Sequence, residues 1–359
     1  MDSLTSKLRL KIIVIRRDNI GDLVCTTPIF HALRLRYPDA HICALVNSYN
    51  VDVLRNNPDI NEIYAYTKAK HREKGETVLG VYISRLRLFA KIRRQHFDYA
   101  IIAGAHFIPR ALRLARMIRP RHILGFTESD QSGSRYIDIG IPYTQPHPMH
   151  EVEDIFRLLA PLGIEGKPPE TRVIPESTEL VEAQKKLRHN GLTTSDGVIG
   201  VHISARKISQ RWPATRFAEL IQKLHELHGR QFILFWSPGD ENNPLHPGDD
   251  SKAKEIMDAV QNVPILAYPT HQLRALIGGL SLCDIVICSD GGAMHLAAGL
   301  GKPILCFFGK SDAARWHPWG VPHRVLQPAS REVNDISVED AMTSFASLLN
   351  DISSQAPEC

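Results

Sequence analysis

The segment RRDNIGD (16–22) places two arginines and an aspartate where an apolar run ends. Asp22 follows the single glycine of this turn and lies at or near the first turn of an expected helix. A carboxylate there fits two roles. It could be a helix-terminal acid, stabilised by the helix dipole by about 0.3–1 kcal/mol, or a general base kept ionised by the dipole and nearby cations. Arg16 and Arg17 would orient Asp22 or contact an anionic substrate.

A second polar turn, SARKISQRWP (204–213), is rich in hydroxyls and cations. Ser204, Lys207 and Arg211 precede a helix expected to open at Trp212-Pro213, since proline is common at the first helical position. Donors ahead of a helix N-terminus form an anion site. A basic surface loop is the alternative, and Trp212 is equally compatible with a packing role that fixes the loop.

A third turn, SDGGAMH (289–295), follows an apolar strand. Its glycines, Gly291 and Gly292, allow close backbone approach, and the N–H groups of the next helix point back at the turn, as in a phosphate cradle. Asp290 could accept hydrogen bonds from sugar hydroxyls, whereas His295 fits a packed core position as well as a ligand contact. The following turn adds Lys310, Ser311, Asp312 and Arg315 to the same rim.

Alternating strands and helices position these turns. Apolar runs of strand length occur at 10–15, 41–46, 99–103, 197–203, 231–236, 263–267, 284–288 and 303–308. Helical periodicity occupies 22–36, 79–95, 108–118, 214–228, 251–261, 270–280 and 292–300. This alternation is typical of parallel sheets with helices on both faces. It predicts an α/β protein with two Rossmann-like domains facing across a cleft.

The proline-containing segment EGKPPETRVIPES (165–177) has no periodicity and reads as a linker. We therefore predict an N-terminal domain over 1–170 and a C-terminal domain over 171–335. A final amphipathic helix and tail cover 336–359, and the pattern does not decide which domain they pack on; packing back on the N-terminal domain is one option. The length of 359 residues agrees with two domains, because single hydrophobic cores stop growing near 250–300 residues.

Ligands of open α/β sheets bind beyond the carboxyl ends of the strands, which is where the three turns lie. A G-x-G-x-x-G fingerprint is absent from the first of them, which argues against a nicotinamide-dependent oxidoreductase. The sequence also has no D-x-D triplet, so we expect no metal-bound diphosphate. The arrangement suits an acceptor in the N-terminal half and a nucleotide-activated donor in the C-terminal half. A non-catalytic sugar-nucleotide or glycan-binding protein remains an alternative.

Charge and cysteine usage bear on partners and location. Residues 68–122 carry 14 Lys or Arg against three acids, a net +11, so the rest of the chain is −7 within the total of +4. This asymmetry indicates either a polyanionic partner or a solvated helix face. None of the six cysteines forms a C-x-x-C pair, so we expect structural thiols. No apolar stretch reaches the ~20 residues of a membrane span, and the N-terminus lacks a signal-peptide core, so we expect a cytoplasmic location.

Together these turns resemble glycosyltransferase family 9, the ADP-heptose:lipopolysaccharide heptosyltransferases. Segment 16–22 resembles the family's strand–R-x-x-x-x-G-D–helix start, and SDGGAMHLAAGLGKP (289–303) resembles its D-(S/T)-G-x-x-H-L-A-A-A-L-G-x-P signature. Segment 307–320, FFGKSDAARWHPWG, resembles F-G-x-T-D-P-x-R-x-x-P-x-G. The chain departs from the family at Gln210, where a lysine is usual, and at Lys310-Ser311, where the family has Pro-Thr.

The resemblance implies a GT-B fold and an inverting, metal-independent transfer of heptose from ADP-heptose to an anionic lipopolysaccharide inner-core acceptor, with no cofactor. Another nucleotide-sugar or a different acceptor is the alternative. Asp22 would be the catalytic base. The expected donor-binding residues are Ser204, Lys207, Arg211, Asp240, Asp290, Gly291, Gly292 and His295, with Glu241 as the alternative to Asp240 for the ribose. The expected acceptor-binding residues are Arg16, Arg17, Arg85 and Arg93. A glycolipid acceptor would account for the basic segment, and it predicts peripheral association with the inner face of the cytoplasmic membrane. Nucleic acid is not an expected partner.

Overall fold

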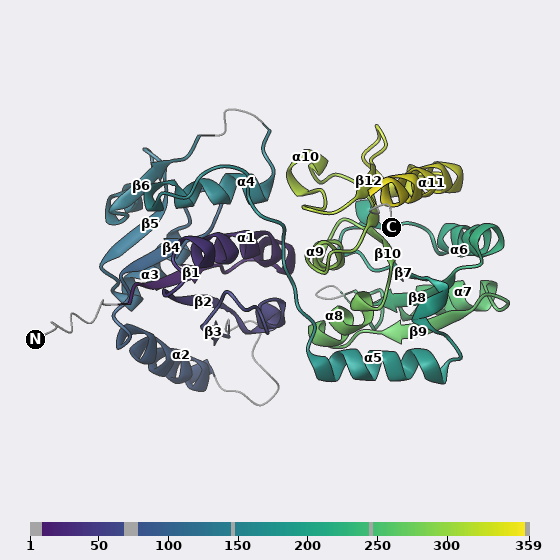
Figure 1. Ribbon diagram of the computed structural model, residues 1–359, viewed down its shortest axis with the longest axis horizontal. Helices are drawn as coiled ribbons and strands as arrows, with labels where there is room; N and C mark the ends of the chain where they lie inside the picture. The colour runs from purple at the N-terminus through teal and green to yellow at the C-terminus, as the bar shows by residue number, and fades with distance from the viewer. Residues whose placement is uncertain (1–8, 68–77, 145–147, 244–246, 356–359) are drawn as a thin grey trace, which may run out of the picture. The chain divides into compact units, whose positions relative to one another are not determined.

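The computed structural model describes residues 9–67, 78–144, 148–243 and 247–355 (Figure 1). The chain divides into two compact units, residues 1–169 and 170–359, and the division falls within the predicted linker. Each unit is built on a six-stranded parallel sheet. The α/β class and the two Rossmann-like halves expected from the sequence are confirmed.

The N-terminal unit has the strand order β3-β2-β1-β4-β5-β6. Its strands are β1 (Lys11–Ile15), β2 (His41–Asn47), β3 (Glu62–Tyr66), β4 (Tyr99–Ile102), β5 (His122–Thr127) and β6 (Ile139–Pro142). Its helices are α1 (Ile20–Arg36), α2 (Val78–Arg93), α3 (Pro109–Ile118) and α4 (Glu151–Phe156), with 3-10 turns that include η1 (Ser48–Val53) and η4 (Arg157–Leu162). Helices α1 and α4 pack together, and α2 packs with α3 on the other face of the sheet (Figure 1).

The alternation of side chains along β1 separates the two arginines of the first turn. Ile13 and Ile15 belong to the core that α2 and α3 cover. Successive residues of a strand point to opposite faces, so Arg17 continues toward α2 whereas Arg16 continues toward α1 and α4. One short segment therefore supplies a cation to each side of the sheet at its carboxyl edge.

The C-terminal unit has the strand order β12-β11-β10-β7-β8-β9. Its strands are β7 (Val198–His202), β8 (Gln231–Trp236), β9 (Ile265–Pro269), β10 (Ile285–Ser289), β11 (Ile304–Phe307) and β12 (His323–Leu326). Its helices are α5 (Ser177–His189), α6 (Ala214–His228), α7 (Asp250–Ala259), α8 (Leu273–Ser281), α9 (Gly292–Gly299), α10 (Ala313–Trp316) and α11 (Val338–Gln355), and η6 (Ile208–Gln210) is a 3-10 turn. Helix α6 packs with α7 and α11, and α8 packs with α5 and α9.

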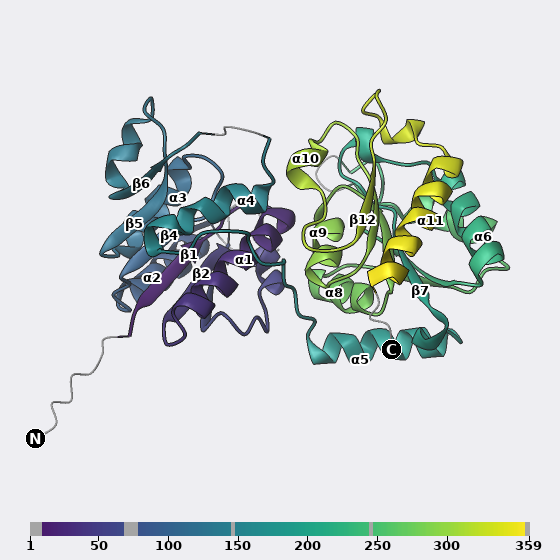
Figure 2. The same ribbon diagram turned by 45° about the horizontal axis from the view of Figure 1, so that its top comes forward.

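The final helix packs on the C-terminal unit. Helix α11 contacts β12, β11 and α6 (Figure 2). Its apolar side chains Ala341, Phe345 and Leu348 are fully buried in the core of this unit. The option that this helix packs back on the N-terminal domain is therefore replaced by packing within its own unit, because its apolar face is already covered there.

The sequence analysis did not predict four strands and three helices, namely β3, β5, β6, β12, α4, α5 and α10. Strands β6 and β12 are short and contain no fully buried residue, so they lack the continuous apolar run of a central strand. Pro213 is the residue before α6 rather than its first helical residue. Among the described residues, no helix is both long enough and apolar enough to cross a bilayer.

Candidate functional site

Arg16 organises the carboxyl edge of the N-terminal sheet. It follows β1, and its Nη1 donates to the carbonyl of Ala103, just after β4, at 2.7 Å. Its Nη2 donates to Asp22 Oδ1 at 2.7 Å and to Glu151 Oε1 at 2.8 Å, and Asp18 Oδ2 lies 3.2 Å from its Nε. The strand order reverses between β1 and β4, which is where open α/β sheets bind ligands. The guanidinium thus ties three carboxylates together at the switch point.

The ion cluster around Arg16 is largely withdrawn from water. The side chains of Arg16 and Glu151 are 3% and 2% exposed, whereas that of Asp22 is 17% exposed. Burial alone would lower the pKa of Arg16, but Glu151, Asp22 and Asp18 together raise it above its ordinary value. The guanidinium is therefore a permanent cation, and of the two carboxylates that share its Nη2, Asp22 is the more accessible.

Asp22 is held on both of its carboxylate oxygens. Oδ1 accepts from Arg16, and Oδ2 accepts from the backbone N–H of Asn19 at 3.0 Å. This second bond belongs to a capping box, in which Asp22 is the third residue of α1. The helix-terminal role considered from the sequence is therefore present. It does not conflict with proton transfer, because the carboxylate is rigidly oriented and part of it is exposed.

A second cationic group lies on the other face of the same sheet edge. Arg17 Nε donates to the hydroxyl of Tyr66, at the end of β3, at 3.1 Å. The guanidinium of Arg85 lies 5.3 Å from the centre of the Tyr66 ring and 5.9 Å from that of Phe89. Burial raises the pKa of the Tyr66 phenol despite the neighbouring arginines, so it stays neutral. We call Arg17, Tyr66 and Arg85 the tyrosine cluster; its two arginines, one hydrogen-bonded to the phenol and one over the ring, are suited to an anion.

The structure separates Arg93 from the other predicted acceptor-binding residues. Arg93 is the last residue of α2, two turns or about 12 Å beyond Arg85 along the helix axis. It lines a hollow of about 510 Å3 between α2 and α3, together with Leu86, Phe89, Ala90, Arg116, Met117 and Arg119. Helix α2 runs from the carboxyl edge of the sheet back to the amino edge, so Arg93 lies nearer the amino edge than Arg85 does. Lys68, Lys70, Arg72 and Lys74 of the basic segment lie outside the described residues.

Gln210 joins two of the predicted turns of the C-terminal unit. Its Nε2 donates to Asp290 Oδ2 at 2.5 Å and to Ser311 Oγ at 2.8 Å, and the residue is 5% exposed. These contacts span β7 and β10, the switch point of the second sheet. The residue at the family's lysine position is therefore a neutral amide that fixes Asp290.

The glycine turn after β10 leaves room for a ligand. Gly291 precedes α9 and Gly292 begins it, and a Cβ placed on Gly291 would meet no atom within 4 Å. His295 is buried, and its ring lies edge-on to Trp316 with centroids 6.0 Å apart. The turn thus brings Asp290 and the first N–H groups of α9 to one rim, while His295 occupies the packed core position that the sequence also allowed.

The second predicted turn is braced by its own hydrogen bonds. Ser204 Oγ accepts from the backbone N–H of Ser237 at 2.9 Å, and Arg211 Nε donates to the carbonyl of Ala205 at 3.0 Å. Lys207 is exposed at the start of η6. Trp212 is buried and donates to the carbonyl of Ile336 at 2.9 Å, so it packs beneath the turn and fixes it.

The two candidates for the ribose acid lie in the loop after β8. Both are exposed, and Asp240 Oδ1 accepts from the backbone and the side-chain N–H groups of Asn242. Asp250, at the start of α7, was not singled out from the sequence. It accepts from Trp236 Nε1 at 2.7 Å and from the Gly239 N–H at 2.9 Å, so it anchors this loop.

Lys252 and His202 are further residues that sequence analysis missed. Lys252 Nζ donates to the carbonyl of Ile203 at 3.0 Å, and burial lowers the pKa of Lys252 to about 8. Burial, assisted by Lys252, lowers the pKa of His202 to about 4, so His202 is neutral at physiological pH. In the sequence, Lys252 lies in a polar helical segment and is therefore expected at the surface. It is buried because the loop after β7, which contains Ile203, lies against it.

His41, Cys43 and Glu62 form the one group of potential metal ligands found among the described residues, with ligand atoms within 4.8 Å of one another. It lies at the amino ends of β2 and β3, away from Arg16. Lys91 Nζ and the Tyr64 hydroxyl donate to the two oxygens of Glu62 at 2.7 and 2.6 Å. A cation would have to displace Lys91, so this donor set suits an ion pair better than a metal.

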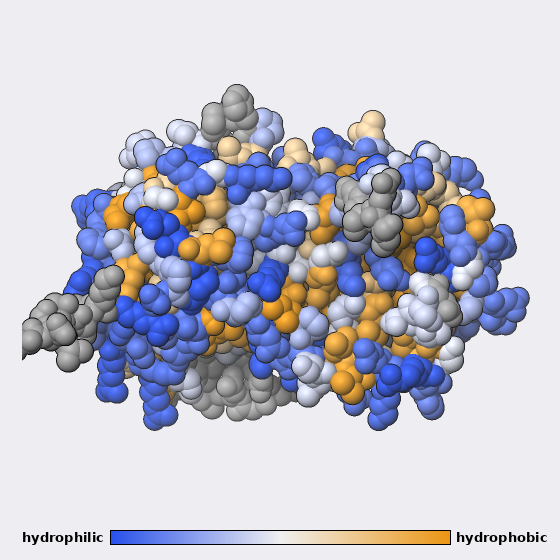
Figure 3. Space-filling view, in the orientation of Figure 1, coloured by the Kyte–Doolittle hydropathy of each residue, from blue (hydrophilic) through white to orange (hydrophobic). Residues whose placement is uncertain are grey.

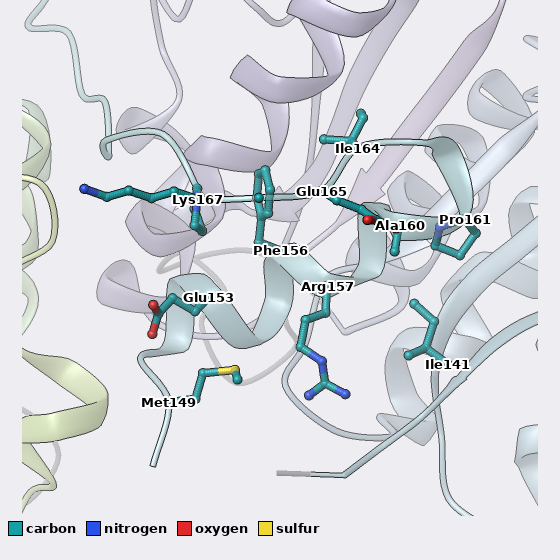
Figure 4. A pocket seen from close by; sticks show the side chains of 12 residues that line it. Ile141, Met149, Glu153, Phe156, Arg157, Ala160, Pro161, Ile164, Glu165 and Lys167 are labelled. Atoms are coloured by element: carbon teal, nitrogen blue, oxygen red, sulfur yellow. The ribbon is translucent and has the colours of Figure 1, made fainter. Parts of the chain in front are cut away.

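An apolar hollow of about 540 Å3 lies on the far side of α4 (Figure 4). Glu153, Phe156 and Arg157 line it, at a spacing that places them on one side of the helix. Glu151 points toward Arg16 instead, two residues earlier and thus on the opposite side. This hollow is therefore separate from the Asp22 cluster.

Two parallel six-stranded Rossmann-like sheets, each with polar side chains tied across its switch point, are the architecture of the GT-B fold. The model of glycosyltransferase family 9 (heptosyltransferase) matches residues 85–344. The chain belongs to this family and is a glycosyltransferase enzyme, as the motifs indicated.

Individual relatives agree with this assignment. Lipopolysaccharide heptosyltransferase 3 of Escherichia coli K12 is 27% identical over 309 residues, which cover 83% of this chain and 82% of the relative. A family 9 glycosyl transferase from Veillonella parvula superposes with a TM-score of 0.78 at 20% identity, covering 95% of this chain and 97% of that one. The E. coli ADP-heptose lipopolysaccharide heptosyltransferase II superposes with a TM-score of 0.74 at 20% identity, covering 96% and 100%. These likenesses show the fold.

Proposed function

We propose that this enzyme transfers a heptose from ADP-heptose to an anionic lipopolysaccharide inner-core acceptor, with inversion at the anomeric carbon and without a metal. The names of its relatives support the donor and the acceptor class. The observation that carries the chemistry is the partly exposed Asp22 carboxylate, fixed by Arg16 at the switch point of the N-terminal sheet. A family 9 transferase that uses another nucleotide-sugar or a different acceptor is the alternative.

The proposed reaction is a single displacement. An acceptor hydroxyl attacks the anomeric carbon, the bond from that carbon to the diphosphate oxygen breaks, and the nucleoside diphosphate leaves. Asp22 takes the hydroxyl proton as the new bond forms. One carboxylate suffices, because a displacement with inversion needs no enzyme nucleophile, by analogy with inverting glycoside hydrolysis.

The leaving diphosphate needs positive charge that Gln210 does not supply. Gln210 is neutral and engaged with Asp290. We assign the charge to Lys207 and Arg211 together with the N–H groups at the start of α9, and preorganised donors of this kind commonly contribute ~3–4 kcal/mol each. Ser204 would add a hydroxyl at the same rim, and Asp240 or Glu241 would bind the ribose.

Substitution of Asp22 by asparagine tests the proposal, because asparagine keeps the size but cannot accept a proton. We expect transfer to fall about 10²–10⁴-fold while ADP affinity, measured by calorimetry, is retained. Asp52→Asn is the matched control, because Asp52 is an acid of the same unit paired with Arg55. Mass spectrometry of products from a panel of nucleotide-sugars and of lipid-linked and soluble acceptors identifies the substrates. An Asp22→Asn enzyme with full activity would remove the assigned base.

We also propose that the N-terminal unit binds an anionic acceptor and, peripherally, the inner face of the cytoplasmic membrane. Helices α2 and α3 expose Arg87, Arg113 and Arg116, and the residues just after their ends expose Arg94 and Arg119. Leu86, which is 63% exposed, and Met117 lie among these cations. Figure 3 shows mainly hydrophilic side chains over α2. Such a surface fits anionic lipid head groups, worth about 1 kcal/mol per cation near the membrane.

The separation of Arg93 from Arg85 allows acceptor binding and membrane binding to be tested apart. Arg85→Glu should raise the acceptor KM because it disrupts the tyrosine cluster, with donor binding unchanged. Arg94→Glu combined with Arg116→Glu should reduce sedimentation with vesicles that contain anionic lipid, in a salt-dependent way, and should leave neutral vesicles unaffected. Equal vesicle binding by this double variant and the wild type would refute the membrane face.

A further inference from the structure

We infer that Glu151 is a positioning residue for Asp22, acting through the guanidinium that the two carboxylates share. The inference rests on the proposed function, since it concerns the base assigned there. Glu151 lies 135 positions from Arg16 in the sequence, in a segment that no motif marks. Its role is to set how strongly Arg16 holds Asp22.

The geometry of the shared contact carries the inference. A single nitrogen, Arg16 Nη2, donates to Glu151 Oε1 at 2.8 Å and to Asp22 Oδ1 at 2.7 Å. The other terminal nitrogen is engaged with the carbonyl of Ala103. The two carboxylates therefore share one donor atom, so a shift of the guanidinium toward one carboxylate weakens its hydrogen bond to the other.

Glu151 is itself held in place by the start of helix α4. It is the first residue of α4, where an acid is stabilised by the helix dipole. The preceding His150 is buried. Its Nδ1 accepts from the Val152 backbone N–H at 3.1 Å, and its backbone N–H donates to Glu153 Oε2 at 3.1 Å, so these bonds hold the start of the helix. Glu151 is thus an anchored anion rather than a movable surface acid.

The charge balance explains what such an anion does to a base. A carboxylate paired alone with an arginine has a lowered pKa and is a weak proton acceptor. A second buried carboxylate on the same arginine shares the positive charge and repels the negative charge on Asp22, which raises its affinity for a proton. Glu151 therefore keeps Asp22 oriented by Arg16 without making it too acidic to act.

Other charged groups around α1 are either paired elsewhere or belong to the same cluster. Asp18 faces Arg16 from the turn before α1. Arg17 is directed at Tyr66 on the opposite face of the sheet. On η1, Asp52 pairs with Arg55; further along α1, His31 pairs with Asp59; and on α4, Asp154 pairs with Arg157. Glu151 is thus the buried carboxylate whose removal changes the charge on the Asp22 side of Arg16.

The test is Glu151→Gln, which keeps the size and one acceptor oxygen but removes the charge. We expect the acid limb of the pH profile of kcat/KM to move down by about one pH unit, and the plateau of kcat to fall about threefold to tenfold. The donor KM should be unchanged. The matched control is Asp52→Asn, an acid of the same unit that pairs with Arg55 and does not touch α4, and it should leave the acid limb in place.

Carboxyl 13C NMR gives a second readout that does not depend on activity. The Asp22 resonance is assigned by its loss in Asp22→Asn. In the wild type it should titrate in two steps, because protonation of a coupled neighbour changes its field, and in Glu151→Gln it should titrate in one step at lower pH. The wild-type titration decides the question even if the variant does not fold.

The outcomes separate the two proposals. An inactive Asp22→Asn enzyme with an unshifted Glu151→Gln profile and a one-step wild-type titration would overturn the role of Glu151 and leave the base intact. A fully active Asp22→Asn enzyme would overturn the base itself. A shifted acid limb in Glu151→Gln, together with a two-step titration of Asp22 in the wild type, would establish Glu151 as the residue that sets the proton affinity of Asp22.

Discussion

Replacement of Arg16 by methionine is the most direct perturbation of the site, because it removes the cation and keeps a side chain of similar length. Glu151 and Asp22 would lose the Nη2 donor at 2.8 and 2.7 Å, and Ala103 would lose its donor at 2.7 Å. Glu151 is 2% exposed, so water cannot easily replace the guanidinium.

Removal of one partner of a buried ion pair typically costs about 3–5 kcal/mol. A folded domain is stable by only about 5–15 kcal/mol. We therefore expect Arg16→Met to lose about a fifth or more of the free energy of unfolding of the N-terminal unit. Urea denaturation followed by circular dichroism and by the fluorescence of ANS measures this loss, and the unfolding of the C-terminal unit serves as an internal reference.

The double variant Arg16→Met, Glu151→Gln tests whether the stranded Glu151 carboxylate causes this loss of stability. If the cost of the single substitution comes from a stranded buried carboxylate, neutralising that carboxylate should recover about half or more of it, a coupling of about 1–3 kcal/mol. A single variant that loses less than about 1 kcal/mol, or a double variant that is no better than the single one, would refute the picture of a buried charge cluster.

Two further predictions concern the C-terminal unit. The pKa of Lys252 is lowered by burial from its ordinary 10.5 to about 8, so the folded state binds this proton less tightly than the unfolded state does. Protonated Lys252 is thus unfavourable at pH 7, and stability rises as pH increases from 8 to 10.5, by about 3 kcal/mol at most. Relative to the wild type, Lys252→Met should be stabilised at pH 7 and lose this advantage near pH 10.5 in urea denaturation; an equal difference at both pH values would contradict the burial of the ammonium. Gln210→Lys places a cation beside Asp290, so we expect ADP to bind several-fold more tightly, with a stronger salt dependence in calorimetry. Unchanged affinity would argue against a diphosphate site at this rim.

The central strands were predictable because they are continuous apolar runs. β1, β2, β7, β8 and β10 are buried along nearly their whole length, which leaves few polar residues to interrupt the pattern. Every residue of β12 is half-buried, so its sequence does not differ from that of a loop. The edge strands form because the preceding strand offers unpaired backbone groups, and the sequence of the edge strand itself does not reveal that offer.

In the candidate site, likewise, contacts between residues close in the sequence were predictable and contacts between distant residues were not. The contact of Arg16 with Asp22 was suggested by their presence in one short turn, since six residues separate them. The contacts of Glu151 with Arg16 and of Gln210 with Asp290 were not predicted, because the partners lie 135 and 80 positions apart and neither spacing has a local pattern. Arg93 was grouped with Arg85 because a charge count ignores the direction of a helix.

Each unit is formed from one uninterrupted stretch of the chain, residues 1–169 and then 170–359, and α11 closes the second unit upon itself. During synthesis, all residues that surround Arg16 are therefore made before those of the second unit. At about 5–20 residues per second, translation of the second unit takes tens of seconds or less, but far longer than a small domain needs to collapse. The buried charge cluster can thus assemble on the nascent chain before the second unit is complete.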